Sequence, residues 1–150
     1  MFERYTEKAR QVIFYARYEA SEFGSPCIES EQLLLGLLRA DTSLTNHFLD
    51  TAQSAESLRK QIELQATIRE KISISIDLPV SDECKRIFEY AAQEAERLGI
   101  KHVGSDHLLV GILLEENCLA ARLLKERGVR LGEVRDAISK RYAEDNDSEG

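Results

Sequence analysis

Residues 33–38 read Leu-Leu-Leu-Gly-Leu-Leu and residues 108–113 read Leu-Leu-Val-Gly-Ile-Leu, so one apolar pattern around a glycine occurs twice, 75 positions apart. Each segment would be apolar on nearly every side of a helix, which is typical of a buried helix. Gly36 and Gly111 would then leave room for a second helix to cross closely. The two segments predict the central helices of an all-α fold.

The repeat extends outward from these segments through most of the chain without a gap. Matched positions include Thr6 and Ser81, Tyr15 and Tyr90, Glu19 and Glu94, Gly24 and Gly99, and Ser30 and Ser105. This period exceeds the roughly 20–50 residues of solenoid repeats, which favours duplication of a small helical bundle. We therefore expect eight helices in two four-helix repeats, related by a pseudo-twofold axis and presenting two equivalent surfaces.

Start and stop signals define the first helix of each repeat. Thr6 is the predicted N-cap of a helix over 7–23, Glu7 suits its positive end, and Gly24 is its predicted stop. The apolar face of this helix comprises Ala9, Val12, Ile13, Ala16 and Ala20. The second helix is expected to begin after Ser30, with Glu31 in its first turn. Short third helices and fourth helices at about 54–69 and 131–142 would complete the repeats.

The expected organisation is one domain over residues 1–142. Repeat one covers about 2–69, a connector about 70–80, and repeat two 81–142. The connector alternates isoleucine with polar residues from Lys71 to Pro79, so we expect an extended segment pinned by its isoleucines, with a flexible linker as the alternative. Residues 143–150 are acidic and nearly devoid of apolar groups, which predicts a disordered tail.

Composition excludes several classes of function. The net charge of -7 and the lack of a basic stripe predict no nucleic-acid binding. No apolar stretch of about 18 residues occurs and the first residues alternate charged with apolar groups, so we expect no membrane span, no signal peptide and a cytoplasmic protein. The 3 cysteines and 3 histidines are scattered, which predicts no disulfide framework and no metal site.

Several motifs together resemble the duplicated amino-terminal domain of the Clp-family AAA+ unfoldases, of the ClpC type, over about residues 2–142. They are Phe2-x-Arg4-Tyr5-Thr6-Glu7-Lys8-Ala9, Ser30-Glu31-Gln32-Leu33-Leu34-Leu35-Gly36-Leu37 and Ser105-Asp106-His107-Leu108-Leu109-x-Gly111. The resemblance implies a domain that recruits substrate or adaptor proteins to an ATP-driven unfoldase, so a Clp ATPase is a candidate partner. The phosphate loop GxxxxGK[ST] does not occur in this sequence, and we expect neither a cofactor nor catalysis.

The resemblance further implies that an acidic residue at the start of the second helix of each repeat binds phosphoarginine, a degradation mark. Such a ligand needs a carboxylate for its guanidinium group and donors for its phosphate, and a helix start bearing an acid offers both. By position the carboxylates are Glu31 and Asp106. The donors expected beside them are Ser30, Ser105, Thr6 and Ser81. The same residue types also make ordinary helix starts, which is the structural alternative.

Departures from the family pattern favour a second hypothesis, an interaction module that binds proteins without phosphoarginine. Glu29 stands where repeat two keeps Gly104, Asp106 is shorter than the usual glutamate, and Gln32 replaces a histidine. Phe14 and Tyr18, four residues apart, could then form an exposed face for a peptide or adaptor, although such aromatics are often core residues.

A hydrolase built from Glu31, Asp106 and His107 is the third hypothesis. Such an enzyme would need a nucleophile or a metal with a supporting base, and the sequence offers no such constellation. We therefore expect a binding domain and not an enzyme.

Overall fold

The structure, a computed structural model, describes residues 2–49, 52–74 and 77–149. Within these ranges the chain forms eight α-helices, and its only β-structure is a pair of isolated bridges. The helices are α1 (Glu7–Phe23), α2 (Ser30–Ala40), α3 (Thr42–Phe48), α4 (Ala52–Gln65), α5 (Asp82–Arg97), α6 (Ser105–Leu114), α7 (Leu119–Glu126) and α8 (Leu131–Glu149). The predicted all-α fold class is confirmed.

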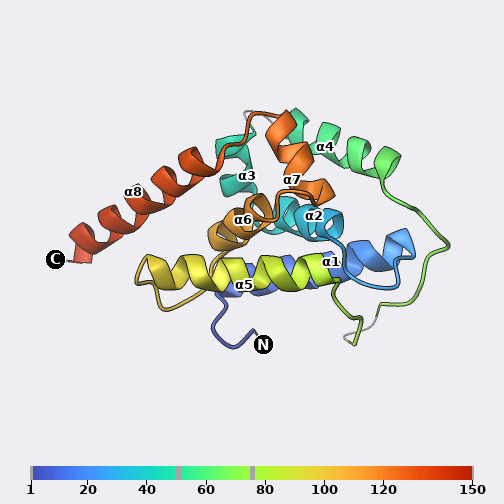
Figure 1. The fold of residues 1–150 in the computed structure, drawn as a ribbon, viewed down its shortest axis with the longest axis horizontal. Helices are drawn as coiled ribbons and strands as arrows, with labels where there is room; N and C mark the ends of the chain where they lie inside the picture. The colour runs from blue at the N-terminus through green and yellow to red at the C-terminus, as the bar shows by residue number, and fades with distance from the viewer. Residues whose placement is uncertain (1, 50–51, 75–76, 150) are drawn as a thin grey trace.

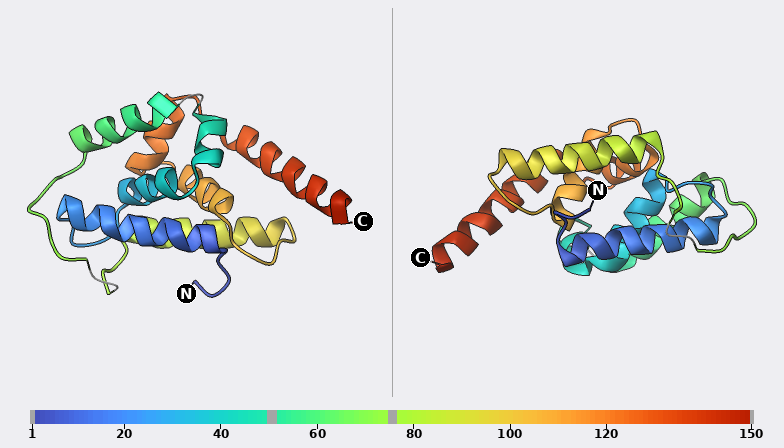
Figure 2. Two further views of the ribbon diagram at one scale, coloured as in Figure 1. Left: turned by 180° about the vertical axis from the view of Figure 1, so that it is seen from behind. Right: turned by 90° about the horizontal axis from the view of Figure 1, so that it is seen from below.

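The helices are arranged in layers (Figure 1). The long helices α1 and α5 run in opposite directions in one layer, and the apolar helices α2 and α6 lie against them in the next. Helices α3, α4 and α7 cover the far side of this middle layer. The end of helix α8 extends beyond the other helices and carries the C-terminus away from them (Figure 2).

The two central glycines permit the close crossing of the layers. A Cβ atom on Gly36 would lie 2.4 Å from the Val12 carbonyl oxygen of α1, and one on Gly111 would lie 2.5 Å from the Ile87 carbonyl oxygen of α5. No side chain fits at such a distance, so α2 and α6 approach the backbone of the neighbouring helix as the sequence predicts.

Backbone hydrogen bonds between the repeats reveal the pseudo-twofold relation. The Thr6 N–H donates to the Val103 carbonyl at 2.9 Å, and the Ser81 N–H donates to the Ile28 carbonyl, also at 2.9 Å. Thr6 matches Ser81 and Ile28 matches Val103 under the shift of 75 positions, so each repeat makes the same contact with the other. Together the two contacts join the start of each first helix to the loop that precedes the other repeat's second helix.

A buried glutamate joins the first helix of each repeat to the fourth. Glu19 of α1 is 2% exposed and accepts a hydrogen bond of 3.1 Å from Nη1 of Arg59 on α4. Glu94 of α5 is 3% exposed and accepts two hydrogen bonds, each of 3.0 Å, from Arg135 on α8. The matched glutamates therefore fix both fourth helices, although the sequences of these helices are the least alike between the repeats.

Several helix boundaries differ from the sequence predictions. Helix α4, expected over about 54–69, runs from Ala52 to Gln65. Helix α2 begins at Ser30 itself, with Glu29 as the N-cap, and α6 begins at Ser105 after Gly104. Helix α8 continues to Glu149, through the segment 143–150 that was expected to be a disordered tail. That segment begins with the helix formers Ala143 and Glu144 and contains no proline and no glycine before Gly150, so nothing in it stops the helix.

The connector is held by its backbone and not by its isoleucines. Ile72 is 38% exposed and Ile74 is 56% exposed, which corrects the expectation that they pin the segment. The Arg69 N–H instead donates to the Phe23 carbonyl at 2.8 Å, and the Ile72 N–H donates to the Ser21 carbonyl at 3.1 Å. The last carbonyls of a helix lack partners within it, so the end of α1 offers these acceptors to the passing chain. Ser75 and Ile76 lie outside the described residues.

Candidate functional site

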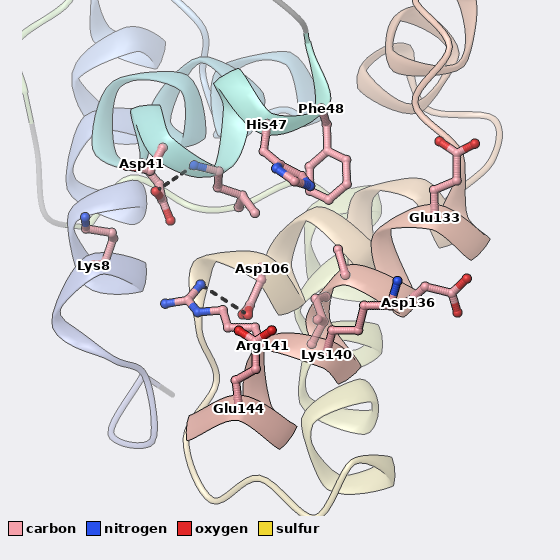
Figure 3. A pocket seen from close by; sticks show the side chains of 14 residues that line it. Lys8, Asp41, His47, Phe48, Asp106, Glu133, Asp136, Lys140, Arg141 and Glu144 are labelled. Carbon is pink, nitrogen blue, oxygen red and sulfur yellow. Dashed lines mark hydrogen bonds and ion pairs between the residues drawn. The ribbon is translucent and has the colours of Figure 1, made fainter. Parts of the chain in front are cut away.

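A pocket of about 770 Å³ lies where the start of α1, helix α3, the start of α6 and helix α8 meet. Figure 3 shows Lys8 of α1 and Asp106 of α6 facing this space, with Arg141 of α8 reaching toward Asp106. His47 and Phe48 of α3 close another side. We call it the Asp106 pocket, because that carboxylate is its most deeply buried charged group.

One oxygen of the Asp106 carboxylate accepts a hydrogen bond, and the other accepts none from the described residues. The residue is 3% exposed, and its Oδ1 accepts a hydrogen bond of 2.8 Å from the N–H of His107 at the start of α6. Its Oδ2 is buried and has no hydrogen-bond partner among the described residues. The nearest cation is Nη1 of Arg141, 3.9 Å from Oδ2, which is an ion pair without a hydrogen bond. A buried carboxylate oxygen in this condition is free to accept a donor from a ligand.

Gly104 allows Asp106 to take this position. A Cβ atom on residue 104 would lie 2.7 Å from Asp106 Oδ1, so any side chain there would force the Asp106 carboxylate to shift. In repeat one the matched position is Glu29, which carries that Cβ atom. The backbone is nearly the same at both N-caps, so the change from Gly104 to Glu29 alters the space around the carboxylate and not the path of the chain.

The Asp106 pocket contains charges of both signs. Lys8, Lys140 and Arg141 are cationic and exposed at its rim. The acidic side chains of the lining are Asp41, Asp106, Glu133, Asp136 and Glu144. A ligand that carries a cationic and an anionic group would be complementary to this arrangement.

His107 and Gln32 have the same structural role at matched positions. The Gly104 N–H donates to His107 Nδ1 at 2.8 Å, and the Glu29 N–H donates to Gln32 Oε1 at 2.7 Å. Each side chain thus caps the start of its own helix. Burial lowers the pKa of His107, which keeps the ring neutral and able to accept this bond. Gln32 is therefore an equivalent of the histidine, and His107 is unavailable as a base at Nδ1.

The hydroxyls of Ser30 and Ser105, which were expected to donate to a phosphate, have partners within the protein. Ser105 is 6% exposed, and its hydroxyl donates to Asp41 Oδ2 at 2.5 Å. Ser30 is fully buried, and its Oγ accepts a bond of 3.4 Å from the Ala120 N–H. Each serine contacts a helix start in the other repeat, because the small first residue of α2 or α6 fits into the interface between the repeats.

Thr6 and Ser81 are the N-caps that the sequence predicts. The Thr6 hydroxyl oxygen accepts from the Ala9 N–H, and the Ser81 hydroxyl oxygen accepts from the Cys84 N–H, each at 3.1 Å. Both residues are half-buried. As an N-cap, each hydroxyl accepts a hydrogen bond with its oxygen and can still donate its own proton to another group.

The surroundings of Glu31 differ from those of Asp106. Glu31 is half-buried; burial raises its pKa, and the negative charge of Glu29 raises it further. Burial and the same Glu29 also raise the pKa of Glu83, which faces this site from α5. The Cys27 thiol donates to Glu29 Oε1 at 3.2 Å. Repeat one therefore presents several carboxylates together, a setting that disfavours a phosphate dianion.

Phe14 and Tyr18 are exposed on α1, at 61% and 36%. The Arg39 guanidinium lies over the rings of Tyr15 and Tyr18, at 4.5 Å and 5.0 Å from their centroids. The other exposed large apolar side chains of the described residues are Leu64, Ile68, Ile72 and Ile74. All of them belong to repeat one or the connector, so the two repeats do not present equivalent surfaces.

Sequence reasoning found Asp106 but missed the cations that accompany it. Lys8 lies two residues after the predicted N-cap Thr6, and its place in the first turn was the available indication. Lys140 and Arg141 lie on α8, whose sequence has no close counterpart in repeat one. No pattern in the sequence indicated that these residues reach the start of α6.

The fold and this pocket define a duplicated all-α binding domain. The family model described as "Clp repeat (R) N-terminal domain" matches residues 4–127, and the chain belongs to this family. The chain is 33% identical over 148 residues to the chaperone protein ClpC1, chloroplastic, of Arabidopsis thaliana, with 98% of this chain and 16% of the relative covered. It is 34% identical over 149 residues to the chaperone protein ClpC, chloroplastic, of Pisum sativum, covering 99% of this chain and 16% of that protein.

Solved structures agree with the family. The N-terminal domain of the caseinolytic protease associated chaperone ClpD from Arabidopsis thaliana superposes with a TM-score of 0.75 at 27% identity, covering 95% of this chain and 97% of that one. The Hsp104 N-terminal domain from Candida albicans shares the fold, with a TM-score of 0.66 at 14% identity over 89% of this chain and 88% of that one. Among the described residues, no helix is long and apolar enough to cross a membrane.

Proposed function

We propose that this domain recruits substrate or adaptor proteins to a Clp ATPase, and that its Asp106 pocket binds phosphoarginine side chains on them. The domain would act by binding alone, without catalysis. Its chain spans only 16% of the ClpC relatives, and those relatives are named as chaperones.

We also propose a cytoplasmic location for the protein. The two named relatives are chloroplast proteins, so fractionation of source cells is the test.

The observation that supports the ligand most strongly is the unpartnered Oδ2 of buried Asp106. A guanidinium group presents N–H donors in a planar fork, which suits a carboxylate oxygen that lacks a hydrogen bond. A phosphate on the same guanidinium would then face Lys8, Lys140 and Arg141 at the rim. The pocket volume of about 770 Å³ exceeds what one side chain needs, leaving space for the peptide that carries it.

The proposal favours one principal site and not two equivalent ones. At Glu31 the neighbouring acids Glu29 and Glu83 would repel the phosphate. The lining of the Asp106 pocket has acidic side chains too, but it adds the cations Lys8, Lys140 and Arg141, with which a phosphate can pair. The sequence differences between the repeats would therefore give the two helix starts unequal affinities for the ligand.

A second candidate function, protein docking without phosphoarginine, is favoured by the exposed side chains of repeat one. Tyr18, Ile68 and the paired Arg39 border a smaller pocket of about 390 Å³, and Phe14 extends the apolar surface along α1. An adaptor that docks there would not require the Asp106 pocket. Phe14→Ser combined with Tyr18→Ser would weaken such an adaptor and leave phosphoarginine binding unchanged.

Calorimetric titration tests the leading proposal. The wild-type chain should bind free phosphoarginine more tightly than arginine or inorganic phosphate, and Asp106→Asn should abolish this preference. Asp136→Asn is the matched control, because Asp136 lines the same pocket but is exposed. A folded wild-type chain that binds none of the three ligands would contradict the proposal and leave protein docking as the better function.

A further inference from the structure

Arg141 is the cation nearest to Asp106, the carboxylate to which the proposed ligand would present its own guanidinium. It extends from α8 toward Asp106, with Nη1 3.9 Å from Oδ2 (Figure 3). Its side chain is 63% exposed, whereas that of Asp106 is 4% exposed. One partner of the pair is thus fixed in the wall, and the other can swing into solvent at little cost.

The segment of α8 that carries Arg141 is anchored on both sides of the side chain. Arg135, earlier on α8, makes two hydrogen bonds of 3.0 Å to buried Glu94. Tyr142 stacks on the buried ring of His107, with centroids 5.8 Å apart and planes inclined by 13°. The backbone at Arg141 is therefore held over the Asp106 pocket while its guanidinium remains free to move.

We infer that Arg141 is a specificity-determining residue that makes the Asp106 pocket select a phosphorylated guanidinium over an unmodified one. This inference rests on the proposed function. Arg141 lies beyond residues 4–127, the part that the family model matches, so the inference concerns a side chain that the family match does not include.

An unmodified arginine would compete with Arg141. Its guanidinium would have to displace Arg141 from Asp106, and two like charges would then lie close together without an anion between them. The ligand would also replace an existing ion pair with another of the same kind. Arg141 thus opposes the binding of unmodified arginine.

A phosphorylated arginine would reverse the effect of Arg141. Its phosphate carries nearly two negative charges and presents oxygens that suit the planar guanidinium fork. When the ligand takes Oδ2 of Asp106, the displaced Arg141 can pair with the phosphate beside it. The same residue therefore weakens one ligand and strengthens the other.

Titration of the full chain with both ligands tests this inference. Arg141→Gln should bind phosphoarginine about tenfold more weakly than wild type, and arginine about two- to fivefold more tightly. Arg141→Lys should recover part of the phosphoarginine affinity, because it restores the charge without the fork. Arg130→Gln is the matched control. Arg130 is exposed and lies outside the pocket, so the substitution removes the same charge without changing the lining.

The outcomes separate this inference from the proposed function. If wild type binds phosphoarginine and Arg141→Gln behaves like Arg130→Gln, the proposed function stands and the inferred role of Arg141 is wrong. If Arg141→Gln weakens both ligands equally, Arg141 contributes general affinity and not selection, which also overturns the inference. If folded wild type binds neither ligand, both the proposed function and the inference fail.

Discussion

Arg135 of α8 and Glu94 of α5 are joined by two hydrogen bonds of 3.0 Å, one from Nε and one from Nη2. Arg97 adds two further bonds to Glu94, from its Nε at 3.3 Å and from its Nη2 at 2.7 Å. The carboxylate is nearly buried while both arginines are partly exposed. This contact fixes the base of α8, and with it the position of Lys140 and Arg141 beside the Asp106 pocket.

Glu94→Gln is expected to destabilise the chain by about 1–2 kcal/mol. The variant removes the negative charge of a carboxylate that accepts hydrogen bonds from two arginines. The cost is moderate because both arginines are partly exposed and can bind water in its place. Chemical denaturation at neutral pH measures the change, and Glu96→Gln serves as control because Glu96 is exposed on the same helix. Equal stability of the two variants would mean that the contact does not anchor α8.

The same pair predicts a dependence of stability on pH. Burial alone would raise the pKa of Glu94, but the hydrogen bonds and charges of Arg97 and Arg135 outweigh it and lower the pKa below the ordinary 4.5. Because the pKa is lower in the folded chain, ionised Glu94 stabilises the fold at any pH above the pKa that the residue has in the unfolded chain. This stabilisation is lost as the pH falls through the pKa of the folded chain. The stability difference between wild type and Glu94→Gln should therefore shrink toward acid, which denaturation at about pH 7 and pH 3.5 would detect.

Gly36→Ala should cost about 1–3 kcal/mol of folding stability, because the new methyl group would meet the Val12 carbonyl oxygen. Gly132→Ala is the matched control. It lies in α8, has no atom within 4 Å of the added Cβ, and should be neutral or stabilise the helix by up to about 1 kcal/mol. Thermal unfolding of the two variants compares them directly, and a tolerant Gly36 would show that the helices need not cross so closely.

Much of the fold could be predicted because its determinants are local and occur twice. Thr6 and Ser81 form caps by bonding to a backbone N–H three residues away, a pattern visible in sequence. Gly36 and Gly111 each interrupt an otherwise apolar helix, which only a close crossing explains. Fold class and helix order followed from these residues without knowledge of any contact between the repeats.

The site could be predicted only in part, because its other residues come from distant segments. Ser105 was expected to donate to a ligand, but its hydroxyl bonds to Asp41, 64 residues away, across the interface between the repeats. Arg141 reaches Asp106 from a helix that the repeat does not align. The burial that distinguishes Asp106 from Glu31 depends on such tertiary neighbours, and a local pattern carries no information about them.

His107→Gln should fold almost as well as wild type, because the amide oxygen can accept from the Gly104 N–H as Gln32 does from Glu29. His107→Leu should lose about 1–2 kcal/mol, since it leaves a buried N–H without a partner. Denaturation of both variants separates capping from packing. If both lost equal stability, the hydrogen bond would not be the main role of the ring.

The histidine also predicts a change with pH that the glutamine variant should lack. Burial lowers the pKa of His107 below the ordinary 6.5, so the unfolded chain takes up a proton more readily than the folded one. This contribution stabilises the fold above pH 6.5 and is lost as the pH falls below it. The stability of wild type relative to His107→Gln should decline between about pH 7 and pH 5. A constant difference over that range would contradict the assignment.

The most direct test of the central claim is a calorimetric titration of phosphoarginine into three proteins: wild type, Asp106→Asn and Glu31→Gln. Each variant removes one carboxylate charge at the start of α6 or of α2. The two variants therefore differ in which of the two matched helix starts is changed. We predict a single dominant site in wild type, its loss in Asp106→Asn, and nearly unchanged binding in Glu31→Gln. Binding that survives in folded Asp106→Asn, or that disappears in Glu31→Gln, would contradict the assignment of the Asp106 pocket as the phosphoarginine site.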